Sequence, residues 1–202
     1  MIRFVVIGQN ADASGGYLID DVPGTGGRID VLLRCVRSAL LISHGVRRDV
    51  MVYLVLGGSS RAPRVLRFEG AKAKFLRPDE RSLAISAKKA LRSETTGSGF
   101  VEVKPGIAVA DGGLGILAAE CQPMRPYRLD QGGRDLREVA GIEAPDAAFF
   151  VGDHLGFDAP TRVWLTDIGA QSVGLGPVSL QAEDAIAIAA NEIDRRRVDI
   201  AR

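Results

Sequence analysis

Short apolar runs alternate along the chain with longer segments of helical periodicity. Runs of strand length predict buried or partly buried strands at Met1–Ile7, Asp49–Leu56, Pro126–Asp130, Ala147–Val151, Arg162–Asp167 and Ser172–Leu175. Arg64–Phe68 also has the pattern of a short strand, and its charged outward positions indicate the edge of a sheet.

Four segments have the signals of helices. Ile29–Ser43 has apolar positions at helical spacing, namely Ile29, Leu32, Leu33, Val36, Leu40 and Leu41. A second helix begins at Pro78-Asp79-Glu80 and runs to about Arg92, with acidic residues first and basic residues last, as the helix dipole favours. Asp111–Cys121 predicts a short helix, and Ser179 can cap a final helix that ends near Arg197.

This alternation predicts one α/β domain. Strands that alternate with helices form a mostly parallel sheet that helices cover on both faces. The 202 residues are enough for one sizeable core, so we expect a single domain over residues 1–202. Thr95–Gly99, made of Thr, Gly and Ser, is predicted to be a flexible link.

The net charge of +1 conceals two oppositely charged halves. Residues 1–104 contain 17 Lys and Arg against 10 Asp and Glu, whereas residues 105–202 contain 9 against 15. A basic half is where a polyanion such as RNA would dock. The alternative is a chance scatter of charge.

Several classes of protein lack support in the sequence. The start of the chain does not resemble a signal peptide, and no apolar run approaches the ~18 residues of a membrane span. Cys35, Cys121 and the two histidines have no metal-ligand spacing. The phosphate-binding loop, the dinucleotide fingerprint and the nucleophile elbow are all missing. We therefore expect a cytoplasmic protein without a metal.

Two glycine-rich segments follow predicted strands and are candidates for a binding site. They are Val151–Phe157 and Val173–Ser179, and ligands of open α/β sheets bind beyond the carboxyl ends of strands. Val151, Leu175, Val178 and Leu180 could wall an adenine ring. The alternative is that both segments are ordinary tight turns. His154 would then be a turn or core residue whose side chain is hydrogen-bonded within the protein.

The third candidate is an arginine-rich stretch around the first predicted helix. It contains Arg28, Arg34, Arg37, Arg47 and Arg48, and Arg81 joins it from the second helix. Guanidinium groups bind phosphate with two hydrogen bonds and stack on bases. The alternative is a solvated helix face with ordinary ion pairs, such as Asp30 with Arg34.

Taken together, these segments resemble the archaeal tRNA pseudouridine N1-methyltransferase family and its bacterial homologues. The matching strings keep their order over nearly the whole chain. They are Pro23–Asp30, Arg34-Cys35, Ser43-His44, Arg47–Asp49, Pro78–Ser82, Lys89–Leu91, Gly152–Gly156, Leu175–Pro177, Asn191 and Asp194-Arg195.

The resemblance implies a fold, a cofactor and an assembly. The fold would be a SPOUT fold with a deep trefoil knot over about residues 127–197, and two copies would form a homodimer. The knotted loops would hold S-adenosylmethionine through Leu129, Gly152, Leu175, Gly176, Pro177, Val178, Ser179, Leu180 and Ala185. The archaeal enzymes carry a cysteine where Ala185 aligns, so an alanine there keeps a backbone contact but lacks the thiol.

The resemblance also implies methylation of N1 of a pseudouridine in RNA, with the tRNA T-loop as the expected target. We assign Arg28, Asp30 and Asp79 as catalytic candidates, with either carboxylate accepting the N1 proton or orienting the base. The expected RNA contacts are Arg34, Arg37, Arg47, Arg48 and Arg81. Both aspartates could instead be helix-start residues.

Three other functions remain open. The chain could be a homologue that binds RNA without methylating it, and the alanine at position 185 is the feature that suggests this function. A methyltransferase of the same fold could act on ribosomal RNA or on uridine. A plain nucleotide-binding protein is the third, although the missing phosphate loop argues against it.

Overall fold

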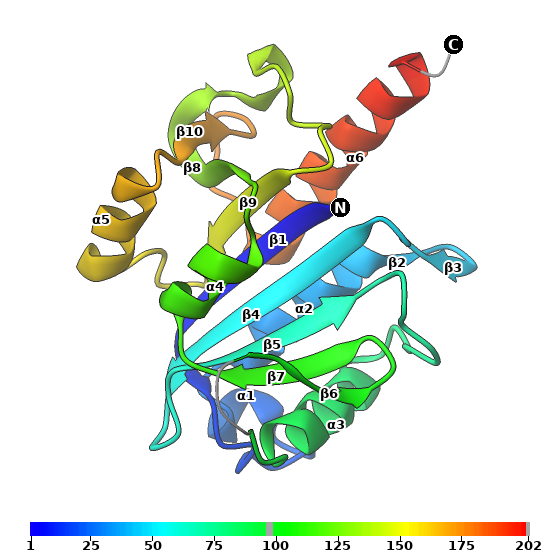
Figure 1. The fold of residues 1–202 in the computed structure, drawn as a ribbon, viewed down its shortest axis with the longest axis vertical. Helices are drawn as coiled ribbons and strands as arrows, with labels where there is room; N and C mark the ends of the chain where they lie inside the picture. The colour runs from blue at the N-terminus through cyan, green and yellow to red at the C-terminus, as the bar shows by residue number, and fades with distance from the viewer. Residues whose placement is uncertain (96–98, 201–202) are drawn as a thin grey trace.

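A computed structural model describes residues 1–95 and 99–200 of the chain, and residues 96–98 of the predicted link lie outside this description. One sheet of eight strands organises the molecule, in the order β10-β8-β9-β1-β4-β5-β7-β6 (Figure 1). The strands are β1 (Ile2–Asp12), β4 (Val50–Gly58), β5 (Arg64–Glu69), β6 (Val101–Lys104), β7 (Ile107–Asp111), β8 (Arg125–Asp135), β9 (Ala147–Gly152) and β10 (Gln171–Gly174).

The five strands β10, β8, β9, β1 and β4 pair in parallel, whereas β5, β7 and β6 extend the sheet in antiparallel fashion. The predicted α/β sheet is therefore confirmed. β1 lies between β9 and β4, and its side chains point alternately into two cores. Phe4 and Val6 lie in one core, and Val5 and Ile7 lie in the other.

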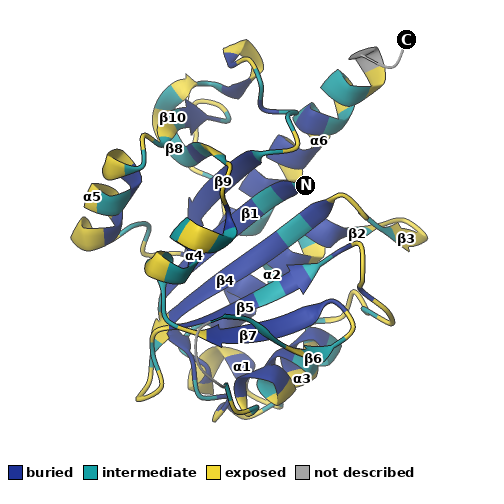
Figure 2. Ribbon diagram, viewed as in Figure 1, coloured by how far each residue is buried: buried dark blue, intermediate teal, exposed yellow. Residues whose placement is uncertain are grey.

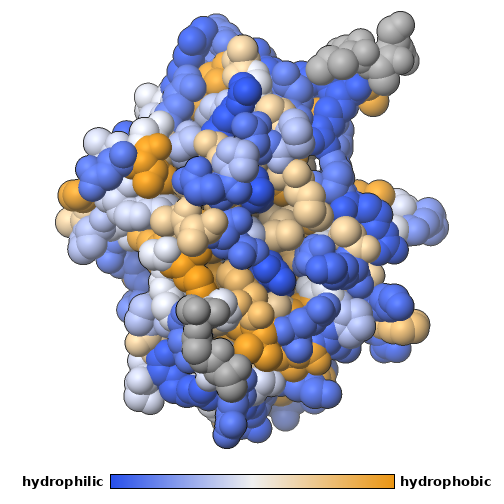
Figure 3. Space-filling view, viewed as in Figure 1, coloured by the Kyte–Doolittle hydropathy of each residue, from blue (hydrophilic) through white to orange (hydrophobic). Residues whose placement is uncertain are grey.

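Helices lie on both faces of the sheet. One face carries α1 (Val22–Thr25), α2 (Ile29–Leu40), α3 (Glu80–Leu91) and α6 (Ala182–Ile200), and the other carries α4 (Leu114–Glu120) and α5 (Ala159–Asp167) (Figure 1). Burial is greatest along the central strands (Figure 2). On the side of α4 and α5, apolar side chains reach the surface beside α4 (Figure 3).

The predicted helix at Ile29–Ser43 begins where expected but ends at Leu40. Leu41–Ile42 pairs instead as strand β2 with β3 (Gly45–Val46) in a small hairpin. The helix from Glu80 is confirmed, with Asp79 as its N-cap. Ser179 does not cap α6, because that helix begins three residues later, at Ala182.

Two predictions about strands were wrong. Arg162–Asp167 is helical, because the Asp158 side chain accepts a hydrogen bond from the Thr161 amide and a proline starts the helix. Arg64–Phe68 is not an edge strand, because β5 pairs with β4 and β7. Its first residue, Arg64, is fully buried, and its guanidinium donates hydrogen bonds to Asp111 at 2.7 Å and to the carbonyl oxygen of Leu91. The sequence patterns did not predict β6 and β7.

The outer parallel strands β8 and β10 meet very closely. Their register shifts between Ser172 and Val173, which pair with Arg128 and Arg134, so residues 129–133 bulge out of the ladder. A Cβ on Gly133 would lie 2.5 Å from the backbone of Val173, and one on Gly174 would lie 2.8 Å from the carbonyl oxygen of Gly133. Only glycine fits at this contact. The close approach of the two strands places the β8 bulge beside the end of β10.

Candidate active site

A cavity of about 440 Å³ opens beside the bulge in the middle of β8 and at the carboxyl ends of β9 and β10. Its walls come from the bulge of β8, the turn after β9, the loop after β10 and the first turn of α6. Its lining consists of Val31, Leu129, Asp130, Gln131, Val151, Gly152, Asp153, His154, Gly156, Phe157, Arg162, Leu175, Gly176, Val178, Ser179, Leu180, Gln181, Ala182 and Ala185.

The turn after β9 is held by the buried carboxylate of Asp153. It accepts hydrogen bonds from the backbone amides of Gln9 at 3.0 Å and Leu155 at 2.8 Å. The Gln9 side chain donates in return to the carbonyl oxygen of Gly156 at 3.0 Å. A Cβ on Gly152 would lie 2.6 Å from the backbone of Gly156, so glycine is needed for the turn to fold this tightly. The turn thus forms a fixed wall of the cavity.

The loop after β10 is open and glycine-dependent. Gly176 has a φ of 142°, a conformation that residues with a Cβ rarely adopt, and no atom lies within 4 Å of the place where its Cβ would stand. The side-chain amide of Gln131 donates to the carbonyl oxygen of Pro177 at 3.0 Å and so links the β8 bulge to this loop. Backbone groups of the loop are therefore accessible to a ligand.

The structure brings together nearly all the residues expected to bind the cofactor. Leu129, Gly152, Leu175, Gly176, Val178, Ser179, Leu180 and Ala185 line the cavity. Pro177 does not line it. Ala185 reaches the cavity from α6 and is 8% exposed.

Several cavity residues were not predicted as site residues. Val31 comes from α2, Gln131 from the β8 bulge and Arg162 from α5. No pattern in the neighbouring sequence marks any of the three as a cavity residue, because each reaches the cavity through the packing of elements that are distant in sequence. Asp153 and His154 lay in a glycine-rich segment that the sequence did single out, and strand-end position was the signal for both.

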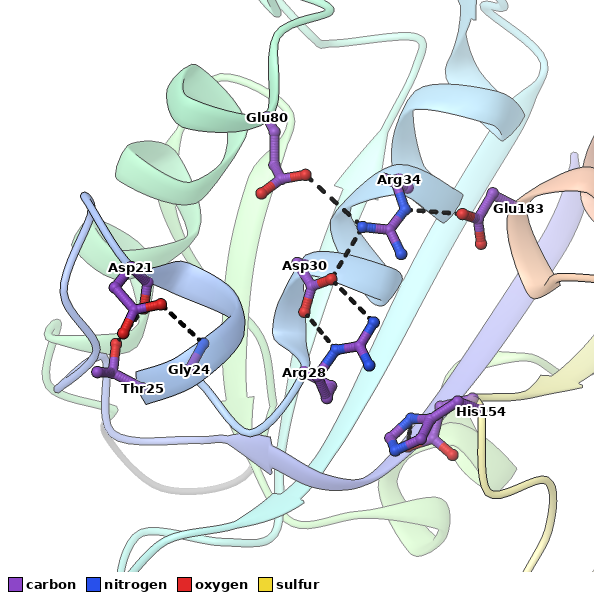
Figure 4. A network of polar contacts seen from close by, with 10 residues as sticks. Asp21, Gly24, Thr25, Arg28, Asp30, Arg34, Glu80, His154 and Glu183 are labelled. Atoms are coloured by element: carbon purple, nitrogen blue, oxygen red, sulfur yellow. Dashed lines mark hydrogen bonds and ion pairs between the residues drawn. The ribbon is translucent and has the colours of Figure 1, made fainter.

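A network of arginines and carboxylates adjoins the cavity. The buried carboxylate of Asp30 accepts hydrogen bonds from Arg28 at 3.1 and 3.3 Å and from Arg34 at 2.8 Å. Arg34 also donates to Glu183 at 2.7 Å and lies 3.7 Å from Glu80 (Figure 4). The network therefore joins α2, α3 and α6.

The sequence places this network beside the cavity wall. Val31 follows Asp30 on α2, Ala182 precedes Glu183 on α6, and both Val31 and Ala182 line the cavity. Arg28 is in the left-handed region at φ 67°, and its side chain is 43% exposed. Gly27 before it lies so close to the carbonyl of Asn10 that no Cβ would fit. The loop thus presents a held, accessible guanidinium near the cavity.

The contacts of Asp30 determine its charge. Burial acts to raise the pKa of Asp30, but the hydrogen bonds and positive charges of Arg28 and Arg34 outweigh it and lower the pKa below its ordinary value. Asp30 is accordingly a carboxylate whose oxygens already accept hydrogen bonds. The arrangement suits a residue that positions two arginines.

Asp79 lies outside this network of contacts. Its carboxylate accepts a hydrogen bond from the Ser82 amide at 2.8 Å and caps α3. The same bonds to Ser82 lower the pKa of Asp79. The structure therefore gives Asp79 a local role at a helix start.

The arginines expected to contact RNA have different surroundings. Arg34 belongs to the network, and Arg37 is exposed on α2. Arg47 binds Asp194 of α6 at 2.6 Å. Arg48 donates to the carbonyls of Gly70, Ala71 and Ala73, whereas Arg81 is 62% exposed and pairs with Asp20 at 2.5 Å. The guanidinium groups of Arg47 and Arg48 are thus hydrogen-bonded to other groups of the protein.

Within residues 1–95 and 99–200, no group of three or more His, Cys, Asp and Glu side chains could hold a metal ion. Among the helices of the same residues, none is both long enough and apolar enough to cross a membrane.

A family model described as "Putative SAM-dependent RNA methyltransferase" matches residues 1–198. The tRNA (pseudouridine(54)-N(1))-methyltransferase of Methanosarcina mazei is 38% identical over 199 residues, which covers 98% of this chain and 93% of that protein. A protein of the same name from Methanospirillum hungatei is 40% identical over 197 residues, and the match covers 98% of each of the two proteins.

A crystal structure of Archaeoglobus fulgidus Nep1 bound to S-adenosylhomocysteine has a similar fold. The TM-score is 0.67 at 18% identity, and the match covers 97% of this chain and 98% of that one. At this identity the likeness shows the fold alone, and it confirms the expected α/β architecture of a mostly parallel sheet flanked by helices. Family model and relatives together confirm the resemblance inferred from the sequence: the chain belongs to the SAM-dependent RNA methyltransferase family of the tRNA pseudouridine N1-methyltransferases.

Proposed function

We propose that this protein transfers the methyl group of S-adenosylmethionine to N1 of a pseudouridine in RNA, at position 54 in the T-loop of tRNA. The observation that carries the proposal is a cofactor-sized cavity beside a held, half-exposed arginine. The relatives named for this reaction, which align with nearly the full chain, support the choice of substrate.

The cavity fits the cofactor. Its volume of about 440 Å³ lies within the roughly 300–1,000 Å³ of typical ligand pockets. Leu175, Leu180 and Ala185 offer apolar walls for the adenine, and the backbone beside Gly176 can approach a ligand closely. S-adenosylmethionine would supply an electrophilic methyl group on a sulfonium.

The RNA base would enter beside Arg28. N1 of pseudouridine carries a hydrogen, so the base must lose this proton while N1 comes within about 3–3.5 Å of the methyl group. Negative charge then develops on the uracil carbonyls, and Arg28 would stabilise it by hydrogen bonding. Asp30 would hold Arg28 and Arg34 in place. Asp79 remains a candidate for orienting the base or accepting the proton.

A homodimer is part of the proposal. Three large apolar side chains are exposed around the cavity: Leu155 after β9 is 50% exposed, Val163 on α5 is 61% exposed and Val178 after β10 is 64% exposed. Contiguous apolar patches are typical of contact surfaces, and in this proposal the three side chains belong to one such patch. A second copy packed there would cover the cavity and exclude water from it.

We also propose that residues 1–202 form one domain, with the trefoil knot over about residues 127–197 and a location in the cytoplasm. One continuous sheet containing both β6 and β10 supports the single domain. The close passage of β10 beside the β8 bulge, at Gly133 and Gly174, supports the knot.

Methyl transfer to matched RNAs tests the function. Purified protein and S-adenosylmethionine are incubated with tRNA carrying pseudouridine at position 54 and with the same tRNA carrying uridine there. We expect methylation of the first tRNA alone, detected by mass spectrometry of its digested nucleosides. Methylation of ribosomal RNA in preference to the pseudouridine-containing tRNA would reject the tRNA target.

Calorimetry separates this proposal from a protein that only binds RNA. We expect S-adenosylmethionine to bind more tightly than NAD or ATP. If folded protein binds the RNA but not S-adenosylmethionine, the chain is a non-enzymatic homologue in which Ala185 fails to replace the relatives' cysteine.

A further inference from the structure

The connection from β5 to α3, residues 70–79, holds an exposed aromatic side chain beside basic residues (Figure 1). Phe75 is 92% exposed, the largest exposure among the large hydrophobic residues that the structure describes. Its neighbours Lys74 and Arg77 are also exposed, and neither forms an ion pair within residues 1–95 and 99–200.

The backbone at Phe75 is in the left-handed region, with φ at 56°. A bulky side chain rarely adopts this conformation, because its Cβ approaches the backbone too closely. A strained residue that also exposes an aromatic ring to water gains no packing in return. Such a combination points to a role in binding.

The connection is firmly anchored on both sides of Phe75. Arg48 donates to three carbonyl oxygens before it, those of Gly70 at 3.1 Å, Ala71 at 3.4 Å and Ala73 at 3.2 Å. Ala73 is buried against the turn between β6 and β7 so tightly that a Cβ on Gly106 would lie 2.5 Å from its amide nitrogen. Leu76 packs on the core that contains Phe4 and Val6. Phe75 is therefore presented outward from a fixed base.

The position of Phe75 relates it to the candidate active site. Glu80, which lies 3.7 Å from Arg34, is five residues further along the chain. Five residues span at most about 18 Å, so an RNA bound at Arg34 could also pass over Phe75.

We propose that Phe75 is a stacking platform for an unpaired base of the RNA substrate, flanked by phosphate contacts from Lys74 and Arg77. Single-stranded bases are commonly recognised by stacking on exposed aromatic rings beside basic side chains. The inference rests on the proposed function for the identity of the ligand as RNA. Arg48 is a positioning residue in this proposal, because it holds residues 70–73 in place while Lys74, Phe75 and Arg77 contact the RNA.

The test measures RNA affinity by fluorescence anisotropy with a labelled RNA hairpin that has a single-stranded loop. We expect Phe75→Ala to weaken binding about 10- to 100-fold, which is the range for loss of one stacked base. Phe75→Trp should bind like the wild type and lose indole fluorescence on binding. Ile42→Ala, which shortens a 49%-exposed apolar side chain elsewhere, is the matched control and should bind normally.

The phosphate contacts have a separate readout. Lys74→Ala and Arg77→Ala should each reduce the slope of log affinity against log salt by about 1. Unchanged affinity in Phe75→Ala, with thermal stability and oligomeric state as in the wild type, would overturn the proposal. A change in oligomeric state at unchanged RNA affinity would also overturn it, since the ring would then be a subunit contact.

Failure of the platform and failure of the proposed function give different results. If the RNA binds through Phe75 but no pseudouridine is methylated, the platform stands and the methyl transfer does not. If pseudouridine is methylated and Phe75→Ala has the wild-type affinity and kcat/KM, only the platform fails.

Discussion

Asp30 is buried between two guanidinium groups and accepts hydrogen bonds from both. Replacing it by Asn removes the charge but keeps the shape. We expect Asp30→Asn to lower the free energy of unfolding at neutral pH by about 1.5–3 kcal/mol, the range for hydrogen bonds to a charged group. Methyl transfer should also fall, because Arg28 loses the partner that orients it. Denaturant unfolding and initial rates measure the two effects.

The pH dependence of this stabilisation follows from the lowered pKa of Asp30. The folded-state pKa lies below the ordinary value of 3.8, so the contribution is fully present above that value and is lost as pH falls through the folded-state pKa. The stability difference between wild type and Asp30→Asn should therefore shrink only in acid. Asp20→Asn is the control, because Asp20 is 87% exposed and its loss should leave stability unchanged. A wild-type rate in Asp30→Asn would contradict the role given to Asp30.

At the scale of elements, the contact between β8 and β10 determines the shape of the cavity. A Cβ on Gly133 would lie 2.5 Å from the backbone of Val173. Gly133→Ala must push the two strands apart, and we expect a loss of roughly 1–3 kcal/mol in unfolding free energy. Binding of S-adenosylmethionine should weaken as well, because the β8 bulge lines the cavity. Thermal unfolding and calorimetry measure both.

Gly132→Ala is a matched control for this prediction. No atom lies within 4 Å of a Cβ placed on Gly132, one residue earlier in the same bulge. The control should unfold and bind like the wild type. Equal effects of the two substitutions would mean that chain flexibility, not the strand contact, is responsible.

At the scale of the whole molecule, the proposed dimer depends on exposed apolar side chains around the cavity. Val163 on α5 is 61% exposed and does not line the cavity. A charge placed there would be buried in the interface without a partner, so we expect Val163→Asp to yield monomers. Light scattering after gel filtration gives the mass. A wild-type protein that elutes as a 21.5 kDa monomer would reject the dimer.

The basic half of the molecule should make RNA binding sensitive to salt. Arg37 is exposed and forms no ion pair in the part of the chain that the structure describes, so Arg37→Ala should lower the salt slope by about 1. Arg47→Ala should act differently, because Arg47 is bonded to Asp194. Its loss should reduce thermal stability more than it changes the salt slope. An affinity that does not depend on salt would contradict the expectation for Arg37. An unchanged melting temperature in Arg47→Ala would contradict the expectation for Arg47.

The accuracy of the sequence-based predictions differs from one segment to another for physical reasons. The central strands β1, β4 and β9 were predicted because they are buried on both faces and so are almost wholly apolar. Arg162–Asp167 contains the short apolar run Val163-Trp164-Leu165, which fits a buried strand as well as a helix, and the cap at Asp158 favours the helix. β7 is a run of only five residues between Gly106 and Gly112, and its last residue, Asp111, was assigned to the following helix, which begins at Leu114.

By itself the sequence determined the central parallel strands, the helices α2, α3 and α6, the glycine-rich strand ends and, through its ordered motifs, the family. These are local properties, since they depend on the period of apolar residues and on glycines at turns. Only the tertiary structure decided which side chains share a site. Val31 reaches the cavity, Arg47 binds Asp194 and Arg48 holds the loop of Phe75 because packing brings together elements far apart in the chain, and no local pattern encodes those contacts.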